Sequence, residues 1–290
     1  MNVQAVEDEL EKLGRVILAA EKWHKDYRKD PVSHGKLINA ETRLERLLRK
    51  YFREFAEQRL PYMINWIAYN TEIQRVQAAD DFKIDVLIED GPFGNEDALL
   101  IQTLYDPVEA AVALGVASGE KVYSLDVGIS RTSAVVRQTA REIVAELVGK
   151  RLNKDGQIID NPNAKFRISD KTRKDIRESL STSIALGEDQ TAATERLTRT
   201  VKDPRRAGTI ARTEAVNSYQ RGLLAMGQES GAVGKQWQSV NPDDICGVNA
   251  AQGIIKLDER FASGHLSPSA HPNCRCTMRL VYPEEFNGML

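Results

Sequence analysis

Apolar residues in the first quarter of the chain recur every three or four positions, the spacing of one helix face. One such stripe runs from Val6 to Ala20, and a second runs from Leu37 to Phe55. The stretch KDPVSHG separates the two stripes, and Pro61 closes the second because proline cannot donate a helical hydrogen bond. We therefore predict a helical hairpin region over residues 1–79, with both stripes packed against a core or a partner.

The next segment, residues 80–128, has a mixed pattern. FKIDVLIEDG alternates between apolar and polar residues, which favours a strand, and GPFGNE has the composition of a loop. In DPVEAAVALGVASG, Pro107 stands behind Asp106 where the first residue of a helix would be, and Gly115 and Gly119 would limit its length. We interpret these residues as a mixed connecting region.

A helical pattern returns over residues 129–203, which we interpret as a helical lead-in to the last part of the chain. A stripe from Thr132 to Leu147 ends at Gly149, and the turn-rich LNKDGQIIDNPN follows as a connector. A second helix centred on Leu180 would be capped by Ser169 or Asp170. A shorter one starts at Asp189.

Small residues line one face of the predicted helix after Pro204. The residues on this face follow one another at steps of four: Ala207, Ala211, Ala215, Tyr219 and Leu223. Such a face lets another helix approach closely. Arg212 and Glu214 lie off it and, being two positions apart, do not face each other, so each should find a partner elsewhere in the fold. Glu214 and Asn217 can share a face.

Composition narrows the class of protein. The 290 residues include 40 basic and 42 acidic ones, so no overall field would attract the chain to nucleic acid or to a membrane. The start of the chain lacks a cationic segment followed by an apolar one, and no later segment reaches eighteen uninterrupted apolar residues. We expect synthesis in the cytoplasm, no membrane contact, and a mainly α (α+β) fold that ends in a small α+β module.

Sulfur and imidazole are concentrated near the end of the chain. The motif HPNCRC holds His271, Cys274 and Cys276, and the remaining cysteine is Cys246. These four side chains are a soft ligand set suited to a tetrahedral structural zinc ion, although Cys274 and Cys276 are spaced CxC and Asn249 occupies the position that would complete CxxC. Two alternatives stay open: a disulfide from Cys246 to a later cysteine, and ordinary packing of three small thiols.

The same motif predicts a clasp that closes the chain onto the Cys246 loop. Pro272 restricts His271 to extended conformations. In an extended segment Cys274 and Cys276 would lie on one face, and Arg275 would point to the other.

Motifs that would indicate an enzyme are missing from the sequence. It has no GxSxG, HExxH or phosphate-binding loop, so we expect no catalytic activity and no catalytic residues. The strongest alternative is a metal-dependent nuclease or hydrolase with Asp243, Asp244 or Glu214 as base. A second alternative is a helical DNA-binding or scaffolding protein.

The order of several short motifs resembles the head morphogenesis family of tailed bacteriophages, named after protein F of phage Mu. The resemblance covers about residues 204–282, within a predicted carboxyl-terminal module of residues 204–290. The matching positions are Ala211, Arg212, Thr213, Glu214, Tyr219, Gly222, Trp237, Asp244, Cys246, Phe261, His271, Pro272, Asn273, Cys274, Arg275 and Cys276. Two departures are Asn249, where the family usually has a second cysteine, and SPSAHPN, which lacks its usual Pro-Pro pair.

This resemblance implies a minor head protein, a structural virion component bound at or near the portal vertex inside the head. It would assist head assembly, DNA packaging or DNA delivery. The implied partners are the portal protein and the major capsid protein, and contact with the packaged DNA is a further expectation.

Overall fold

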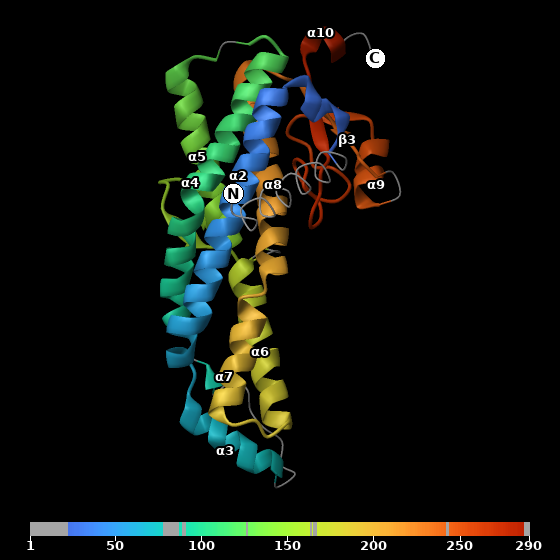
Figure 1. Cartoon of the computed structure of the whole chain (residues 1–290). Helices are drawn as coiled ribbons and strands as arrows, with labels where there is room; N and C mark the ends of the chain where they lie inside the picture. The colour runs from blue at the N-terminus through green and yellow to red at the C-terminus, as the bar shows by residue number, and fades with distance from the viewer. Residues whose placement is uncertain are drawn as a thin grey trace, which may run out of the picture. The chain divides into compact units, whose positions relative to one another are not determined.

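The protein is mainly helical, as predicted, with its strands in two small sheets (Figure 1). The structure is a computed structural model of the chain and describes residues 23–77, 87–88, 91–125, 127–162, 164, 167–241 and 244–286. The helices and single helical turns within these residues are η1 Lys25–Lys29, α2 Pro31–Glu54, η2 Phe55–Arg59, η3 Leu60–Met63, α3 Trp66–Gln77, α4 Gly91–Val122, α5 Ile129–Leu147, α6 Ile168–Ala185, α7 Gln190–Val201, α8 Pro204–Ser230, α9 Ile245–Ala251 and α10 Pro283–Phe286. The strands are β1 Lys150–Leu152, β2 Ile158–Asp160, β3 Gly234–Gln238, β4 Ile254–Lys256 and β5 Thr277–Val281.

The chain divides into two compact units. Unit 1 contains Met1–Thr42, Pro107–Ala140 and Arg212–Leu290, and unit 2 contains Arg43–Asp106 and Arg141–Ala211. Helices α2, α4, α5 and α8 each contribute residues to both units. The division into four regions that we drew from the sequence stays a prediction.

The helical hairpin is only partly described, because the stripe from Val6 to Ala20 lies outside the described residues. Helix α2 carries the second stripe, but it begins at Pro31, inside the predicted break. Proline suits this position, since the first turn of a helix needs no donor there. The helical path also runs on through a π-helical turn and a 3₁₀ turn to Met63, followed by α3, which the sequence pattern did not predict.

Helix α4 replaces most of the predicted connecting region. The predicted loop GPFGNE forms its first turns, and Pro107 lies inside it instead of at its start. An internal proline costs ~3 kcal/mol, but burial at steps of four, as at Leu100, Leu104 and Val108, favours a continuous helix. Of the predicted strand in FKIDVLIEDG, the described Ile88 forms an antiparallel bridge with Ile64.

Helix α7 in unit 2 begins where the sequence predicted, whereas the predicted cap of α6 is wrong. Asp189 caps α7 by accepting a hydrogen bond from the Ala192 amide at 2.8 Å. Helix α6 is preceded by Arg167, which makes no side-chain cap. Ser169 lies inside the helix, where its hydroxyl is buried and donates to the carboxylate of Asp97. This tertiary partner explains why Ser169 does not cap.

The predicted connector after α5 is a hairpin. Strands β1 and β2 pair antiparallel, with Arg151 opposite Ile159. The side chain of Asn153 accepts hydrogen bonds from the backbone of Asp155 and Gln157, which stabilises the turn between the strands. Gly149 ends the preceding helix with φ 77°, in the left-handed conformation expected of a helix-terminating glycine.

Glycines allow α4 and α8 to approach closely within unit 1. A Cβ at Gly222 would lie 2.2 Å from the carbonyl oxygen of Val112, and one at Gly115 would lie 1.9 Å from that of Tyr219. The predicted stripe on α8 is buried, and its Ala215 and Tyr219 pack in one apolar cluster with residues of α2 and α4. Gly115 therefore lies within a helix and permits this contact, instead of ending the helix as predicted.

By length and composition alone, Phe93–Val122 of α4 could cross a membrane. In the structure, however, its residues Val108, Ala111 and Val112 are buried inside the protein. The core helix of a protein can be as apolar as a membrane-spanning helix, so the length and composition of this segment are weak evidence for a membrane span.

The larger sheet positions the residues of the HPNCRC motif. Its strand order is β4-β3-β5, with β3 antiparallel to both neighbours and Trp237 opposite Met278. Helix α9 packs beside β3 (Figure 1). Strand β5 begins directly after Cys276, so the sheet fixes the end of the motif.

Candidate functional site

Cys246 is held in the first turn of α9 by a capping aspartate. The Asp244 carboxylate accepts hydrogen bonds from the amides of Cys246 at 2.7 Å and Gly247 at 3.2 Å. Capping of this kind orients the first turn of a helix. As a result the Cys246 side chain points inward and is fully buried.

A tight turn brings His271 and Cys274 together. Asn273 has a left-handed backbone with φ 60°, which asparagine tolerates better than most residues. The Cys274 amide donates to the carbonyl of His271 at 3.2 Å and closes the turn. The segment is thus not a regular strand before β5, but Cys274 and Cys276 share one buried cluster while Arg275 points away, as the sequence predicted.

The predicted ligands converge on one place. The Sγ atoms of Cys246 and Cys274 and one ring nitrogen of His271 all lie within 4.8 Å of one another. All three cysteines are free and buried, and the Sγ atoms of Cys246 and Cys274 are 3.7 Å apart. Cys276 lies in the same cluster, and hydrogen bonds from the other two thiols lower the pKa of its own thiol. The same contacts raise the pKa of Cys246.

His271 has a polar partner on each side of its ring. Its Nδ1 lies 2.9 Å from the carbonyl oxygen of Pro272, and its Nε2 lies 3.4 Å from a carboxylate oxygen of Asp244. The first contact places the hydrogen on Nδ1. Nε2 is then the ring nitrogen that can bind a metal ion.

The wall of the cluster is aromatic. Trp237 and Phe261 pack edge to face with ring centroids 5.0 Å apart, and the Lys235 ammonium lies 5.3 Å from the Phe261 centroid. Lys235 is itself buried and donates to the carbonyl of Leu266 at 2.8 Å. These contacts hold the loop after β4 against the sheet.

Asn249, which stands where a second cysteine was expected, has a structural task of its own. It is fully buried, its amide nitrogen donates to the Ser263 hydroxyl at 2.9 Å, and its oxygen accepts from the Ser263 amide at 3.0 Å. These two hydrogen bonds join α9 to the loop that contains Ser263. In a CxxC motif this position would instead hold a cysteine.

The predicted motif residues of α8 contact the HPNCRC turn. Arg212 donates to the side chain of Asn273 at 2.6 Å, and the Asn273 amide donates to the Thr213 hydroxyl at 3.0 Å. Glu214 accepts a hydrogen bond from Asn217 at 3.0 Å, so these two do share a face. Arg212 is therefore one of the residues that tie α8 to the loops after it.

Arg275 extends this connection to the amino-terminal part of unit 1. It pairs with the Glu41 carboxylate at 2.7 Å, donates to the Arg212 carbonyl at 3.1 Å and lies over the Trp23 ring at 4.1 Å. Tyr27 adds a second link by donating to the Cys276 carbonyl at 3.0 Å.

Sequence reasoning missed the residues outside the motif. Trp23, Tyr27 and Glu41 carry no pattern that points to a site some 230 residues away. Gln220 was also missed, although its side chain donates to the Tyr27 hydroxyl at 2.8 Å and to the Thr277 hydroxyl at 2.9 Å. Gln220 could have been found from the sequence, because it lies on the same face of α8 as motif residues.

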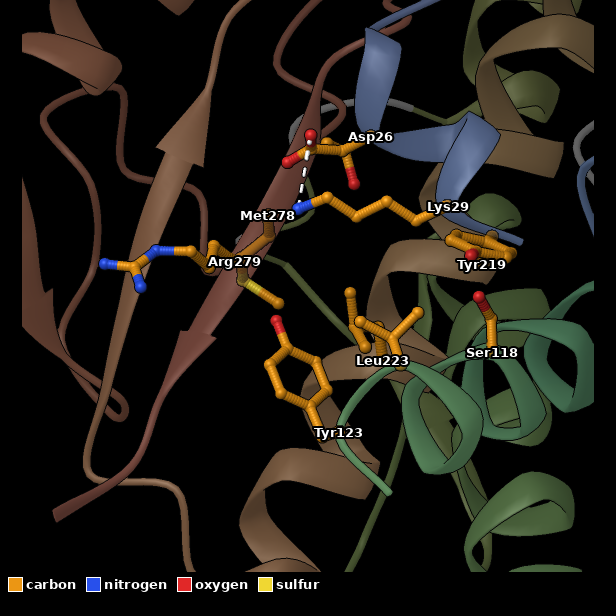
Figure 2. Close-up of a pocket in the computed structure, with 10 residues that line it drawn as sticks. Asp26, Lys29, Ser118, Tyr123, Tyr219, Leu223, Met278 and Arg279 are labelled. Atoms are coloured by element: carbon orange, nitrogen blue, oxygen red, sulfur yellow. Dashed lines mark ion pairs between the residues drawn. The ribbon is translucent and has the colours of Figure 1, made fainter. Parts of the chain in front are cut away.

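A small pocket lies beside β5 (Figure 2). It is lined by residues of η1, α4, α8 and β5, and Lys29 and Asp26 form an ion pair of 3.3 Å at its edge. Its volume is about 40 Å³, which suits one or two water molecules and not a substrate.

The comparisons with known proteins bear on this site directly. A family model described as Phage Mu protein F like protein matches residues 174–279, from within α6 to within β5. Residues 174–279 are Phage Mu protein F-like. No curated protein and no solved structure matches the chain.

The match confirms the resemblance seen in the motifs of the sequence. All four predicted ligands and the predicted motif residues from Arg212 to Arg275 lie inside the Phage Mu protein F-like segment.

Proposed function

We propose that the protein is a minor head protein that binds at or near the portal vertex inside the phage head and assists head assembly, DNA packaging or DNA delivery. The observation that carries this proposal is the family match over residues 174–279, which contains the whole HPNCRC turn and the helix face that it contacts. The partners we propose are the portal protein and the major capsid protein.

A structural role without catalysis agrees with the chemistry of the site. The polar groups of the motif residues are engaged in contacts within the fold, as in the Arg212–Asn273 and Arg275–Glu41 contacts. Such contacts stabilise a fold and leave few groups to act on a substrate. We propose that this module serves as a rigid body that presents a surface to its partners.

Co-expression of the tagged full chain with the portal protein, with the major capsid protein, or with both tests the proposal. We expect the portal protein to co-purify, and mass spectrometry of purified particles to detect the chain in few copies. Recovery of neither partner, together with absence from the particles, would show that the proposal is wrong.

Surface variants can locate the contact. Tyr62 and Ile67 are 89% and 83% exposed, unusually high fractions for large apolar side chains. We expect Tyr62→Ser with Ile67→Ser to reduce portal recovery if unit 2 makes the contact, whereas Val32→Ser, at a position 61% exposed in unit 1, serves as the control.

The same preparation separates the alternatives. Reproducible cleavage of duplex or single-stranded DNA in the presence of divalent metals, abolished by Glu214→Ala, would favour a nuclease. Salt-dependent DNA affinity without portal affinity would favour a DNA-binding or scaffolding protein.

A further inference from the structure

Two buried thiols in unit 1 already have the spacing of metal ligands. Tetrahedral zinc binds sulfur at about 2.3 Å, which places two sulfur ligands about 3.8 Å apart. The Sγ atoms of Cys246 and Cys274 are 3.7 Å apart, and a ring nitrogen of His271 lies within 4.8 Å of both. Small side-chain adjustments would bring all three atoms onto one ion.

The hydrogen bonding of His271 prepares it for a metal. Metal-binding histidines usually donate their second ring N–H to a carbonyl or a carboxylate, which fixes the tautomer. Here Nδ1 lies 2.9 Å from the Pro272 carbonyl oxygen, so the lone pair is on Nε2. Nε2 lies 3.4 Å from a carboxylate oxygen of Asp244 and is then the ring nitrogen that could bind an ion.

Cys276 offers a fourth ligand, because its side chain lies in the same buried cluster as Cys246 and Cys274. The amide of Val240 donates to its sulfur at 3.5 Å. An N–H donor of this kind is a usual neighbour of a metal-binding sulfur. The buried Trp237 indole belongs to the same cluster.

The arrangement favours a structural metal and not a catalytic one. Zinc sites with four protein ligands are closed, whereas catalytic sites keep a position open for water. Cys246, Cys274 and Cys276 are all buried, and two of the chain segments that would meet at the ion are the first turn of α9 and the turn before β5. An ion here would fasten these segments to each other.

We propose that Cys246, His271, Cys274 and Cys276 bind one zinc ion, which fastens the first turn of α9 to the turn before β5. Asp244 orients this site from outside, since it caps α9 and contacts the ring of His271. The proposal concerns stability of unit 1 and holds or fails independently of the portal partner.

Metal analysis of the full chain tests the site. The protein is expressed in zinc-supplemented medium and purified without chelator, and bound metal is measured by mass spectrometry. We expect about one zinc ion per chain. Replacement by Co²⁺ should give the visible absorption of a tetrahedral site together with sulfur-to-cobalt charge transfer. Zinc below a tenth of an equivalent and no Co²⁺ uptake by the folded chain would overturn the proposal.

Variants identify the ligands. Cys246→Ser, Cys274→Ser and His271→Ala should each lower zinc content at least tenfold after dialysis. His265→Ala is the matched control, because His265 lies in the same loop and is not one of the proposed ligands; its Nδ1 lies 2.9 Å from the Ser263 hydroxyl oxygen. Cys276→Ser should weaken the sulfur-to-cobalt charge transfer; an unchanged spectrum would exclude Cys276 as a ligand and contradict the four-ligand site.

A chelator experiment on the parent chain decides the matter if the variants fail to fold. Removal of the metal should lower the melting temperature and make all three thiols react faster with a thiol reagent, and added zinc should reverse both effects. Melting and thiol reactivity that do not change with chelator or zinc would show that the cluster is ordinary packing.

Discussion

Arg275 joins three segments of unit 1 through one buried side chain. Its guanidinium pairs with Glu41 of α2, donates to the backbone of Arg212 in α8, and lies over the Trp23 ring. Both charges are largely withdrawn from water, with side-chain exposures of 6% for Arg275 and 12% for Glu41. A buried pair of this kind is costly to break, since the remaining charge keeps its desolvation penalty without a partner.

We therefore expect Arg275→Ala to lower the free energy of unfolding by ~3–5 kcal/mol. Urea denaturation followed by tryptophan fluorescence measures the change. Arg275→Met combined with Glu41→Leu is the control and should cost much less, because it removes both charges at once. Equal losses for the single and double variants would contradict the account.

Lys235 predicts a dependence of stability on pH. Burial lowers the pKa of Lys235 to about 8, from 10.5 for a free lysine. Between these values the folded state has released a proton that the unfolded state still holds, so stability rises with pH. Below about pH 8 both states are protonated, and the folded state bears the full cost of the buried charge.

The measurement compares the parent with Lys235→Met in urea unfolding from pH 7 to pH 10. We expect the parent to gain stability relative to the variant above about pH 8. A difference between the two proteins that stays constant over this range would show that Lys235 is not desolvated.

The sequence identified part of the candidate site at the residue scale. Cys246, His271 and Cys274 could be found because sulfur and imidazole are rare in this chain and fall in one motif. The amide of Val240 could not be assigned to Cys276, because its direction depends on how β3 leads into the following loop. The sequence showed Asn249 only as the absence of a second cysteine. In the structure its side chain makes two hydrogen bonds to Ser263.

Among the elements, the contact of α4 with α8 depends on glycines, which have no side chain to separate the two helices. The Cβ of an alanine at position 222 would be 2.2 Å from a backbone oxygen of Val112, which cannot move without displacing α4. We expect Gly222→Ala to destabilise the protein by ~1–3 kcal/mol through overpacking.

Gly35→Ala is the matched control for this substitution. Gly35 lies within α2, and a Cβ there would meet nothing within 4 Å. Alanine should stabilise the helix at this position by ~0.5–1 kcal/mol because of its higher propensity. Thermal unfolding of both variants gives the comparison, and a stabilised Gly222→Ala protein would show that the helices do not approach this closely.

Local signals located some element ends and failed at others. The start of α7 could be predicted because Asp189 makes its cap within four residues. The start of α4 could not, because GPFGNE has the composition of a loop and is helical only where tertiary burial outweighs propensity. The prediction that Pro107 begins a helix was wrong for the same reason. A proline at the start of a helix and a proline inside a buried helix cannot be told apart from the sequence.

At the scale of the molecule, unit 1 is built from three separate stretches of chain. The sequence predicted a carboxyl-terminal module of residues 204–290. In the structure, Arg275 of that stretch pairs with Glu41, and the carbonyl of Cys276 accepts a hydrogen bond from Tyr27. The Phage Mu protein F-like segment thus relies on contacts with residues outside its own limits.

We expect the fragment of residues 204–290 to fold less stably than the full chain. Without residues 23–42 and 107–140, Arg275 and the apolar face around Ala215 and Tyr219 lose their partners in α2 and α4. The fragment should be poorly soluble or should melt without a cooperative transition, as followed by circular dichroism. A fusion of residues 23–140 to 204–290 through a flexible linker should recover part of the transition, since it restores the partners in α2 and α4. A fragment that melts cooperatively at the temperature of the full chain would instead show that the module predicted from the sequence folds by itself.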